Sequence, residues 1–216
     1  MVLTLYKLDP SPPARAVLMT IHVAKIPDVQ YVDVNILEGE QFSKEFLQMN
    51  PQHTIPTLKD DDFIVWDSHA ISVYLLTKYS DDVTFYPIEP KKRALIDQRL
   101  HFDSGVLFAT LRSTVRPLLF LGERTYRKDA LKRIKNAYDL TEKFLTNNWM
   151  VGDEITLADI CCVASISSLN EILPIDSDMY PNMIQWLERC KEQEFYKKCN
   201  QPGLEEFRAI LQSKLE

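Results

Sequence analysis

Glycine is scarce in this chain, with only five among 216 residues, and none of the five forms a phosphate-binding loop or a dinucleotide fingerprint. A nucleotide cofactor is therefore not expected. Positive charge is also in deficit: the net charge of −6 gives a nucleic-acid role no electrostatic support. No apolar run reaches the ~18 residues of a membrane span. The first residues lack a basic-then-apolar signal, so we interpret them as a strand.

Cysteine is equally sparse, and the four cysteines all lie in the C-terminal part, at Cys161, Cys162, Cys190 and Cys199. Their spacing matches neither a metal site nor a Cys-x-x-Cys motif, so they are typical of buried or free thiols in a reducing compartment. What the chain does have is a hydrophobic content of 45%, which is ample for one large core or two smaller ones.

The first third of the chain alternates between short strand-like segments and amphipathic helical ones. A strand at 2–8 leads into a proline-rich loop at 9–13, and a helix follows with apolar residues at helical spacing. The order of elements favours a thioredoxin-like domain with a mixed sheet. The later elements expected are a strand at 31–34, a short helix within 39–49, strands from Thr57 and at 63–66, and a helix from 67 or 68 to 79.

The segment Asn50–Leu58 organises this region because it places a proline at the start of a strand. Pro56 cannot donate to a strand ladder, so we interpret it as a bend, for which a cis peptide bond is one option. Such a bend leaves the backbone of Ile55 free to pair with an extended ligand. The alternative is an ordinary edge-strand proline. The three aspartates at 60–62 are expected to form the following hairpin turn.

The next helix is predicted to begin at Asp67 or Ser68, either of which can act as its N-cap. A helix N-terminus with a hydroxyl and unpaired N–H groups can receive a carboxylate, and Asp67 beside it can hold an ammonium. Together they suit the zwitterionic end of an amino acid. The alternative is a plain N-cap without a ligand, which is the commoner fate of an isolated Asp-Ser pair.

After a polar, aperiodic linker at 81–89, the pattern becomes entirely helical. Pro117 should kink or end the first long helical stretch near Arg116. Thr156–Asp159 has the form of a capping box, and the apolar segment 160–173 behind it should be the buried centre of a helical domain. Two apolar stripes are expected on the first stretch: Ile96, Leu100, Leu107 and Leu111, and beside it Phe108, Leu111, Val115 and Leu119.

Three motifs stand in order along the chain, at Leu8–Arg15, Asn50–Leu58 and Asp67–Ile71. With them the sequence resembles a cytosolic glutathione S-transferase over essentially its whole length, most closely the insect epsilon class, near the delta class. The resemblance implies an N-terminal thioredoxin-like domain joined to an all-helical domain. The implied boundaries are 1–80 for the first domain, 81–89 for the linker and 90–216 for the second.

The resemblance also implies the chemistry. Glutathione would be the co-substrate, and its thiolate would be conjugated to hydrophobic electrophiles in xenobiotic detoxification, a role linked to insecticide resistance. Peroxidase or dehydrochlorinase side activities are compatible with it. The expected assembly is a cytoplasmic homodimer, with candidate contacts at Phe102–Leu107 and near Trp66. No metal, nucleic acid or membrane partner is expected.

Ser11 lies between two prolines at the mouth of the first helix, where a serine is usually a turn residue or an N-cap. The resemblance places the catalytic serine here, donating a hydrogen bond to the glutathione thiolate. It assigns glutathione contacts to Gln41, Gln52, His53, Thr54, Ile55, Pro56, Asp67, Ser68, His69 and Arg112. It assigns the hydrophobic substrate site to Leu8, Pro13, Phe108, Leu111, Val115, Leu119, Phe120, Leu204 and Phe207.

Two positions depart from the family pattern. Asp67 stands where a glutamate is common, which shortens the reach by one methylene, and Gln41 stands where epsilon-class members often have histidine. The first rival hypothesis is a carrier of hydrophobic ligands on the same fold. The second is a thiol-disulfide oxidoreductase, which is disfavoured because Ser11–Ala14 occupies the place of a Cys-x-x-Cys motif. The sequence does not name the second substrate.

Overall fold

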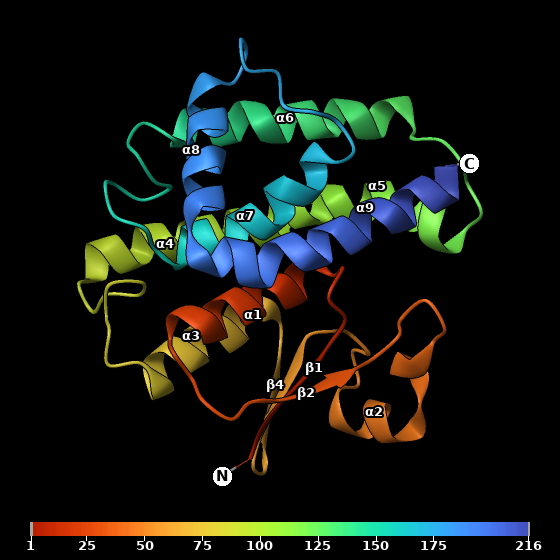
Figure 1. Cartoon of the computed structure of the whole chain (residues 1–216), viewed down its shortest axis with the longest axis vertical. Helices are drawn as coiled ribbons and strands as arrows, with labels where there is room; N and C mark the ends of the chain where they lie inside the picture. Colours follow the sequence, from red (N-terminus) through yellow and green to blue (C-terminus); the bar gives the residue numbers. More distant parts are fainter. Residues whose placement is uncertain (1, 216) are drawn as a thin grey trace.

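The computed structural model describes residues 2–215 and consists of a sheet-containing part below a bundle of helices (Figure 1). None of the helices in this described part combines the length and apolar character that a bilayer crossing demands. The sheet-containing part comprises β1 (Leu3–Lys7), α1 (Pro12–Val23), β2 (Gln30–Asp33), η1 (Glu40–Phe42), α2 (Lys44–Met49), β3 (Thr57–Asp60), β4 (Phe63–Trp66) and α3 (Ser68–Tyr79). The bundle comprises α4 (Pro90–Phe102), η2 (Asp103–Leu107), α5 (Phe108–Phe120), α6 (Lys128–Phe144), α7 (Leu157–Asn170), α8 (Pro181–Glu192), η3 (Tyr196–Asn200) and α9 (Gln201–Leu215).

The sheet has four strands in the order β2-β1-β3-β4. Strand β1 pairs in parallel with β2 and antiparallel with β3, while β3 and β4 form an antiparallel hairpin. The mixed sheet predicted from the order of elements is therefore confirmed. Leu5 of β1 lies opposite Leu58 of β3, and both side chains are fully buried against α1 and α3.

The hairpin differs from the prediction at Asp60, which belongs to β3 and pairs with Phe63 instead of forming part of the turn. Its carboxylate is almost completely buried and accepts hydrogen bonds from Tyr74, Lys78 and Tyr79 at 2.5 to 2.6 Å. These three donors of α3 hold Asp60 inside the strand, so the turn is confined to the two residues that follow. The prediction was wrong because it used only the local sequence, whereas the three donors lie more than ten residues further along the chain.

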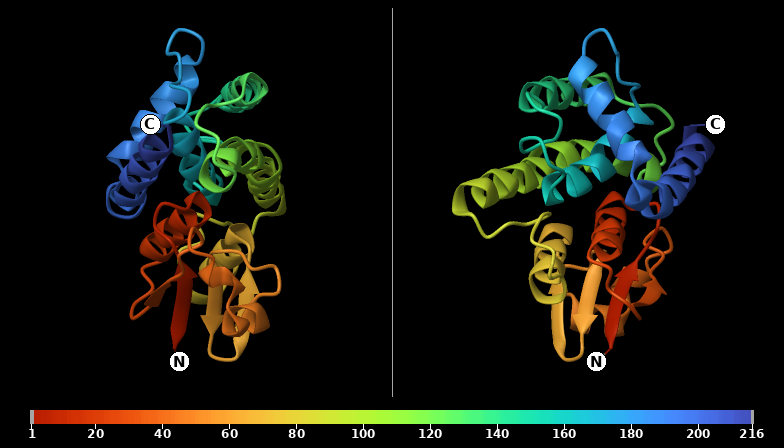
Figure 2. Two further views of the ribbon diagram at one scale, coloured as in Figure 1. Left: turned by 90° about the vertical axis from the view of Figure 1, so that its right-hand side faces the viewer. Right: turned by 60° about the vertical axis from the view of Figure 1, so that its left-hand side comes forward.

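Helix α1 lies between the two parts of the molecule (Figures 1 and 2). Val17 and Ile21 pack into the core between sheet and helices, whereas Ala16 and Met19 join the larger core of the helical bundle. Because two faces of α1 are buried in two different cores, its position relative to both parts is fixed by packing. Pro12 opens the helix, as expected for a proline where the missing N–H costs nothing.

The buried centre of the bundle is α7, as predicted, and it begins with the predicted capping box. The carboxylate of Asp159 accepts hydrogen bonds from the backbone of Thr156 at 2.8 Å and from Met150 at 2.8 Å. It also accepts one from the indole of Trp186 at 2.9 Å. Burial raises the pKa of Asp159, and these hydrogen bonds oppose that rise. The cap thereby ties the start of α7 to α8.

Pro117 does not end its helix, because α5 continues to Phe120. A proline removes the hydrogen bond to the carbonyl four residues earlier, which belongs here to the exposed Ser113, where water can replace the lost donor. Of the two alternatives expected at Pro117, the helix end near Arg116 was therefore wrong, and the kink stays a prediction. A π-helical segment, η2, joins α4 to α5 and was not predicted. The residues of both predicted stripes still face inward.

Candidate functional site

A cavity of ≈ 670 Å³ lies between the sheet-containing part and the bundle. It brings together residues from the loop before α1, the segment before β3, the start of α3 and one face of α5. The predicted site residues that line it are Leu8, Ser11, Pro13, Gln41, Gln52, His53, Thr54, Ile55, Pro56, Asp67, Ser68, His69, Phe108, Leu111, Arg112, Val115, Leu119, Phe120 and Phe207. One predicted member is missing: Leu204 does not line the cavity, because it packs inside the core of the bundle.

Asn50 holds the loop that leads into β3, although no function was predicted for it. Its fully buried amide donates hydrogen bonds to the carbonyl of Thr54 at 3.0 Å and to the hydroxyl of Thr57 at 2.9 Å. Its side-chain oxygen accepts from the backbone of Gln52 at 2.9 Å. Because one buried side chain satisfies both ends of the loop, residues 52–56 are held in a fixed shape against the cavity.

Within this loop the Ile55–Pro56 peptide bond is cis. Among the described residues, neither the N–H nor the C=O of Ile55 makes a hydrogen bond within the chain. The backbone of Ile55 therefore remains available to an extended ligand, as the sequence suggested. His53 has a left-handed backbone with φ of 48° and is exposed, and its ring lies 4.9 Å from that of Phe42.

The two glutamines on this side of the cavity differ in how they are held. The side-chain oxygen of Gln52 accepts a hydrogen bond from the indole of Trp66 at 2.9 Å. Gln41 is only 8% exposed, and its amide nitrogen donates to the carbonyl of Ile36 at 3.3 Å. The side-chain oxygen of Gln41 is buried without a partner in the described part of the chain. A buried acceptor without a donor favours a ligand that supplies one.

Asp67 is the N-cap of α3, which settles the choice that the sequence left between Asp67 and Ser68. One of its oxygens, Oδ1, accepts from the backbone of His69 at 3.0 Å and of Ala70 at 3.2 Å. These two N–H groups are therefore not free for a carboxylate, contrary to expectation. The hydroxyl of Ser68 and the second oxygen of Asp67 make no hydrogen bond among the described residues and face the cavity end of the helix.

Ser11 is the N-cap of α1, yet its side chain makes no capping hydrogen bond. Its hydroxyl lies on the cavity wall and its backbone N–H is already engaged with the carbonyl of Leu8 at 3.0 Å. Pro12 and Pro13 have no N–H to offer, which makes the hydroxyl of Ser11 a free polar donor at this end of the helix. The arrangement leaves that hydroxyl available to a ligand.

Arg15 lies one turn behind Ser11 and is completely buried. Its guanidinium donates to the side chains of Asn200, at 2.6 Å, and of Ser168, and within residues 2–215 it forms no ion pair with a carboxylate. Burial lowers the pKa of Arg15 to about 9, so the side chain keeps its charge at neutral pH. Gly203 packs closely against both Arg15 and Asp9. A Cβ at Gly203 would lie 2.9 Å from Cδ of Arg15 and 2.2 Å from the carbonyl oxygen of Asp9.

His69 at the start of α3 forms an ion pair with Asp103 of η2, with Nε2 and Oδ2 2.9 Å apart. Burial alone lowers the pKa of His69, but hydrogen bonding to Asp103 and the neighbouring Cys161 outweigh it and raise the pKa to about 11. The imidazole is therefore charged at neutral pH. Burial raises the pKa of the Cys161 thiol, which stays protonated. This pair connects the two parts of the molecule across the cavity floor.

Other lining residues were not predicted. Asp103 and Cys161 could not have been found, because only the fold brings them beside His69. Arg116 could have been found, since it lies four residues after Arg112 and hence on the same helix face. The remaining additional lining residues are Pro10, Pro12, Ala16, Ile36, Leu37, Phe42, Ser104, Ser165 and Ile210.

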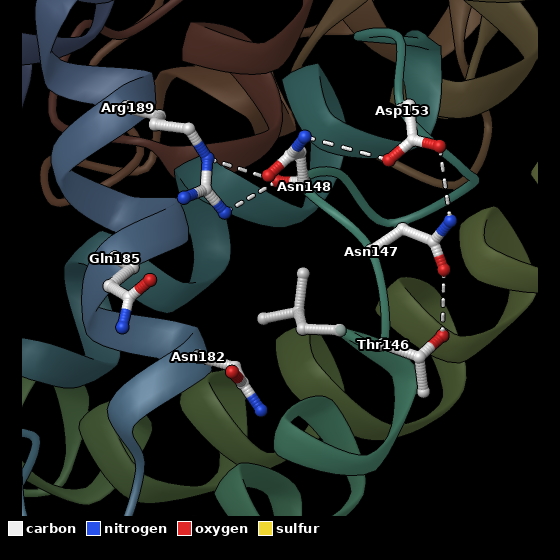
Figure 3. Close-up of a pocket in the computed structure, with 8 residues that line it drawn as sticks. Thr146, Asn147, Asn148, Asp153, Asn182, Gln185 and Arg189 are labelled. Atoms are coloured by element: carbon white, nitrogen blue, oxygen red, sulfur yellow. Dashed lines mark hydrogen bonds between the residues drawn. The ribbon is translucent and has the colours of Figure 1, made fainter.

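A second, polar hollow of ≈ 340 Å³ lies beside α8, and Figure 3 shows hydrogen bonds that link Thr146, Asn147, Asn148, Asp153 and Arg189 along one side of it. Arg189 donates to the carbonyl of Asn148 at 2.6 Å, and Asn147 donates to Asp153 at 3.3 Å. None of the predicted site residues lines it. Because most of its polar groups are engaged with one another and no titratable cluster among the described residues faces it, we assign it no chemistry. Within residues 2–215 no group of three or more His, Cys, Asp or Glu side chains is placed to hold a metal ion.

Comparison with known proteins gives matches over nearly the whole chain. Residues 5–83 match the family described as "Glutathione S-transferase, N-terminal domain", and residues 95–194 match "Glutathione S-transferase, C-terminal domain". The chain is 58% identical to "Glutathione S-transferase 1" of Manduca sexta, with both sequences covered completely. Among solved structures, an epsilon-class glutathione S-transferase of the housefly, Musca domestica, is 40% identical, with a TM-score of 0.95 and 98% of both chains covered.

A further solved structure, described as a glutathione transferase homologue from Drosophila mojavensis, was determined with bound glutathione. It is 40% identical to this chain, with a TM-score of 0.95, and the match covers 99% of this chain and 97% of that one.

Proposed function

The chain belongs to the glutathione S-transferase family, and from that premise we propose that it joins the thiolate of reduced glutathione to hydrophobic electrophiles. A bond forms between sulfur and the electrophilic carbon, and the leaving group departs with the electron pair of the bond that breaks. The thiol loses its proton before attack, because the thiolate is the nucleophile. The rate therefore depends on how strongly the site favours the thiolate.

The observation that carries this proposal is the uncommitted hydroxyl of Ser11 on the cavity wall. That hydroxyl donates a hydrogen bond to the bound sulfur and favours its charged form. The positive end of α1 acts in the same direction, as does the buried charge of Arg15 one turn behind. Ser11 needs no neighbouring base, because the attacking atom is the sulfur of glutathione.

The peptide ends of glutathione are held on the opposite side of the cavity. Asp67 and Ser68 bind the γ-glutamyl end, the second oxygen of Asp67 accepting from the ammonium. The backbone of Ile55 pairs with the cysteinyl unit. His53 binds the glycine carboxylate, and the unpaired oxygen of Gln41 accepts the glycine N–H beside it. The other proposed glutathione neighbours are Gln52, Thr54, Pro56, His69 and Arg112.

The hydrophobic substrate binds in the part of the cavity that is lined by α5 and by the loop before α1. Phe108 and Leu119 are only partly buried and line the cavity, so their side chains are free to contact a ligand. An apolar cavity with a few polar groups at one end is the usual form of a small-molecule site. The remaining proposed contacts are Leu8, Pro13, Leu111, Val115, Phe120 and Phe207.

The same proposal includes the setting of the enzyme. It acts as a cytoplasmic homodimer in xenobiotic detoxification, with a contribution to insecticide resistance and with peroxidase and dehydrochlorinase reactions as side activities. Residues 1–80 hold glutathione, residues 90–216 supply most of the hydrophobic site, and 81–89 join them. The support is the arrangement of α1 and α5 around one cavity.

Conjugation of glutathione to chlorodinitrobenzene tests this function, since release of chloride and formation of the thioether are both measurable. Turnover that saturates with glutathione and with the aryl halide supports the proposal. A protein that binds apolar dyes in the cavity but shows no turnover above the uncatalysed rate would instead be a ligand carrier. Reduction of a disulfide without conjugation would favour an oxidoreductase.

A further inference from the structure

The face of α5 that lines the cavity carries two cations among its apolar side chains. Arg112 and Arg116 are exposed, lie four residues apart and both line the cavity. Like charges at this spacing repel and weaken a helix. The repulsion between these two arginines would be relieved by an anionic partner inside the cavity.

No such partner lies within the described part of the chain. Neither arginine takes part in an ion pair or a side-chain hydrogen bond, whereas Arg127, Arg133 and Arg208 each pair with a carboxylate. Two acidic residues line the cavity: Asp103 pairs with the charged His69, and Asp67 caps α3 with one oxygen and is proposed to hold the ammonium of glutathione with the other, so neither pairs with Arg112 or Arg116. The α5 side of the cavity therefore presents two cations without an ion-pair partner among the described residues, in a protein whose net charge is −6.

The two arginines differ in their surroundings. Arg112 lies one turn before Arg116 and is the member proposed to face glutathione, which brings carboxylates of its own. Arg116 lies one turn further along, between Val115 and the apolar pair Leu119 and Phe120. A cation beside an apolar wall matches a molecule with an apolar body and an acidic group at its end.

We propose that this end of the cavity selects electrophiles that carry a carboxylate beside an apolar body, with Arg116 binding the carboxylate. The inference rests on the proposed function and specifies its second substrate. The carboxylate is not changed in the reaction: sulfur forms a bond to the electrophilic carbon elsewhere in the molecule, and the leaving group departs with its electron pair. Arg116 acts on affinity and orientation alone.

A matched pair of substrates tests the proposal: chlorodinitrobenzoic acid and its methyl ester, each conjugated with glutathione by the intact protein. Arg116→Gln should lower kcat/KM for the acid about three- to tenfold, the range between an exposed ion pair and a partly enclosed charged hydrogen bond. The ester should change less than about twofold. The loss should appear in KM, and added salt should reduce acid selectivity in the parent but not in the variant.

Two further variants make the result specific. Arg124→Gln removes the same charge from an exposed, unpaired arginine that does not line the cavity, and it should leave both substrates unchanged. Arg116→Lys keeps the charge and should retain most of the selectivity for the acid. Equal effects of Arg116→Gln on acid and ester, or none on either, would overturn the inference. A parent protein that conjugates neither substrate contradicts the proposed function itself.

Discussion

Ser11 is the residue on which the activation of glutathione is expected to depend most. A hydrogen bond to a charged group contributes about 1.5–3 kcal/mol. At about 1.36 kcal/mol for each pKa unit, Ser11→Ala should raise the pKa of the bound thiol by roughly one to two units. Turnover near neutral pH should fall strongly and recover in part as the pH rises. Glutathione should still bind, since Asp67 and Ser68 remain.

The measurement is the pH profile of turnover together with the ultraviolet absorbance of the bound thiolate, for parent and variant. Ser11→Thr keeps the hydroxyl and serves as the control, which should retain part of the depressed thiol pKa. If Ser11→Ala and the parent give the same thiol pKa, the serine is only a turn residue. Another group, such as the buried charge of Arg15, then activates the sulfur.

The position of a residue at the cavity was predictable where a short local pattern specifies the geometry. Ile55 before a proline and Asp67 before an amphipathic helix are patterns of this kind, and both residues line the cavity as expected. The partner of His69 was not predictable, because Asp103 lies 34 positions further along the chain. Leu204 was misplaced for a related reason, since an apolar stripe alone does not tell which of its members face a core.

At the scale of elements, the contact between α9 and the loop before α1 leaves no room for a side chain at Gly203. An added Cβ would lie 2.2 Å from the carbonyl oxygen of Asp9 and 2.9 Å from Cδ of Arg15. Gly203→Ala must therefore displace the loop that holds Ser11, and we expect it to cost about 3 kcal/mol of stability. Denaturant unfolding together with turnover should report both losses.

Gly105→Ala is the matched control, because a Cβ there would meet no atom within 4 Å. Gly105 lies in η2 with a helical backbone, so this variant should be as stable as the parent or slightly more stable. Similar stability for Gly203→Ala and the parent would mean that the loop before α1 moves freely. It would also remove the argument that α9 positions Ser11.

The ion pair between α3 and η2 predicts a dependence of stability on pH. The pKa of His69 is raised from 6.5 to about 11 in the folded protein, so its contribution is fully present below pH 6.5 and is lost as the pH rises toward the folded value. Asp103→Asn should therefore lower the free energy of unfolding by about 3 kcal/mol at pH 6, as for other broken buried pairs. The difference should shrink steadily in alkaline solution.

Denaturant unfolding of parent and variant at several pH values between 6 and 10 measures this difference. Lys92→Gln breaks an exposed ion pair with Glu154 and serves as the control. Lys92→Gln should lower the free energy of unfolding by no more than about 1 kcal/mol, and this loss should not vary with pH as it does for Asp103→Asn. A difference between parent and Asp103→Asn that stays constant with pH would mean that the pair acts by packing alone.

Most elements of this fold could be predicted from local patterns, and the exceptions share a cause. Asp60 looked like a turn residue, but three donors on α3 hold it within β3. Pro117 looked like a helix end, but α5 continues because the carbonyl that loses its partner belongs to the exposed Ser113. The π-helical segment η2 had no signal in the sequence at all. In each case the surroundings in the folded molecule decided against the local preference.

At the scale of the whole molecule, α1 packs against both parts of the protein and fixes the position of Ser11 between the two proposed substrates. One of its faces packs on the sheet through Val17, and another packs in the helical core through Met19. Its N-terminus therefore cannot move relative to either part without disturbing a core. Ser11, held by this helix, lines the same cavity as the proposed glutathione contacts and the apolar wall of α5. The two substrates can thus meet at a fixed point.

The final prediction concerns assembly, which we expect to be a homodimer. Within the predicted contact 102–107, Phe102 and Leu107 are buried in the core, so only Ser104, Gly105 and the half-buried Val106 are left to offer surface there, while the segment near Trp66 stays a prediction. Larger exposed apolar side chains lie at Phe63, which is 46% exposed on the same outer strand β4 as Trp66, and at Leu95, which is 47% exposed on α4. An unpaired edge strand with an exposed aromatic ring favours association with a second copy.

Sedimentation equilibrium at micromolar concentration should give a mass about twice the chain mass of 25.1 kDa. Phe63→Lys should shift the parent dimer toward monomer, because a charge at the interface loses its water. Met179→Lys changes an apolar residue that is 58% exposed, on the loop before α8, and should leave the mass unchanged. A parent that sediments as a monomer would exclude the dimer, whereas a dimer insensitive to Phe63→Lys would place its interface away from β4.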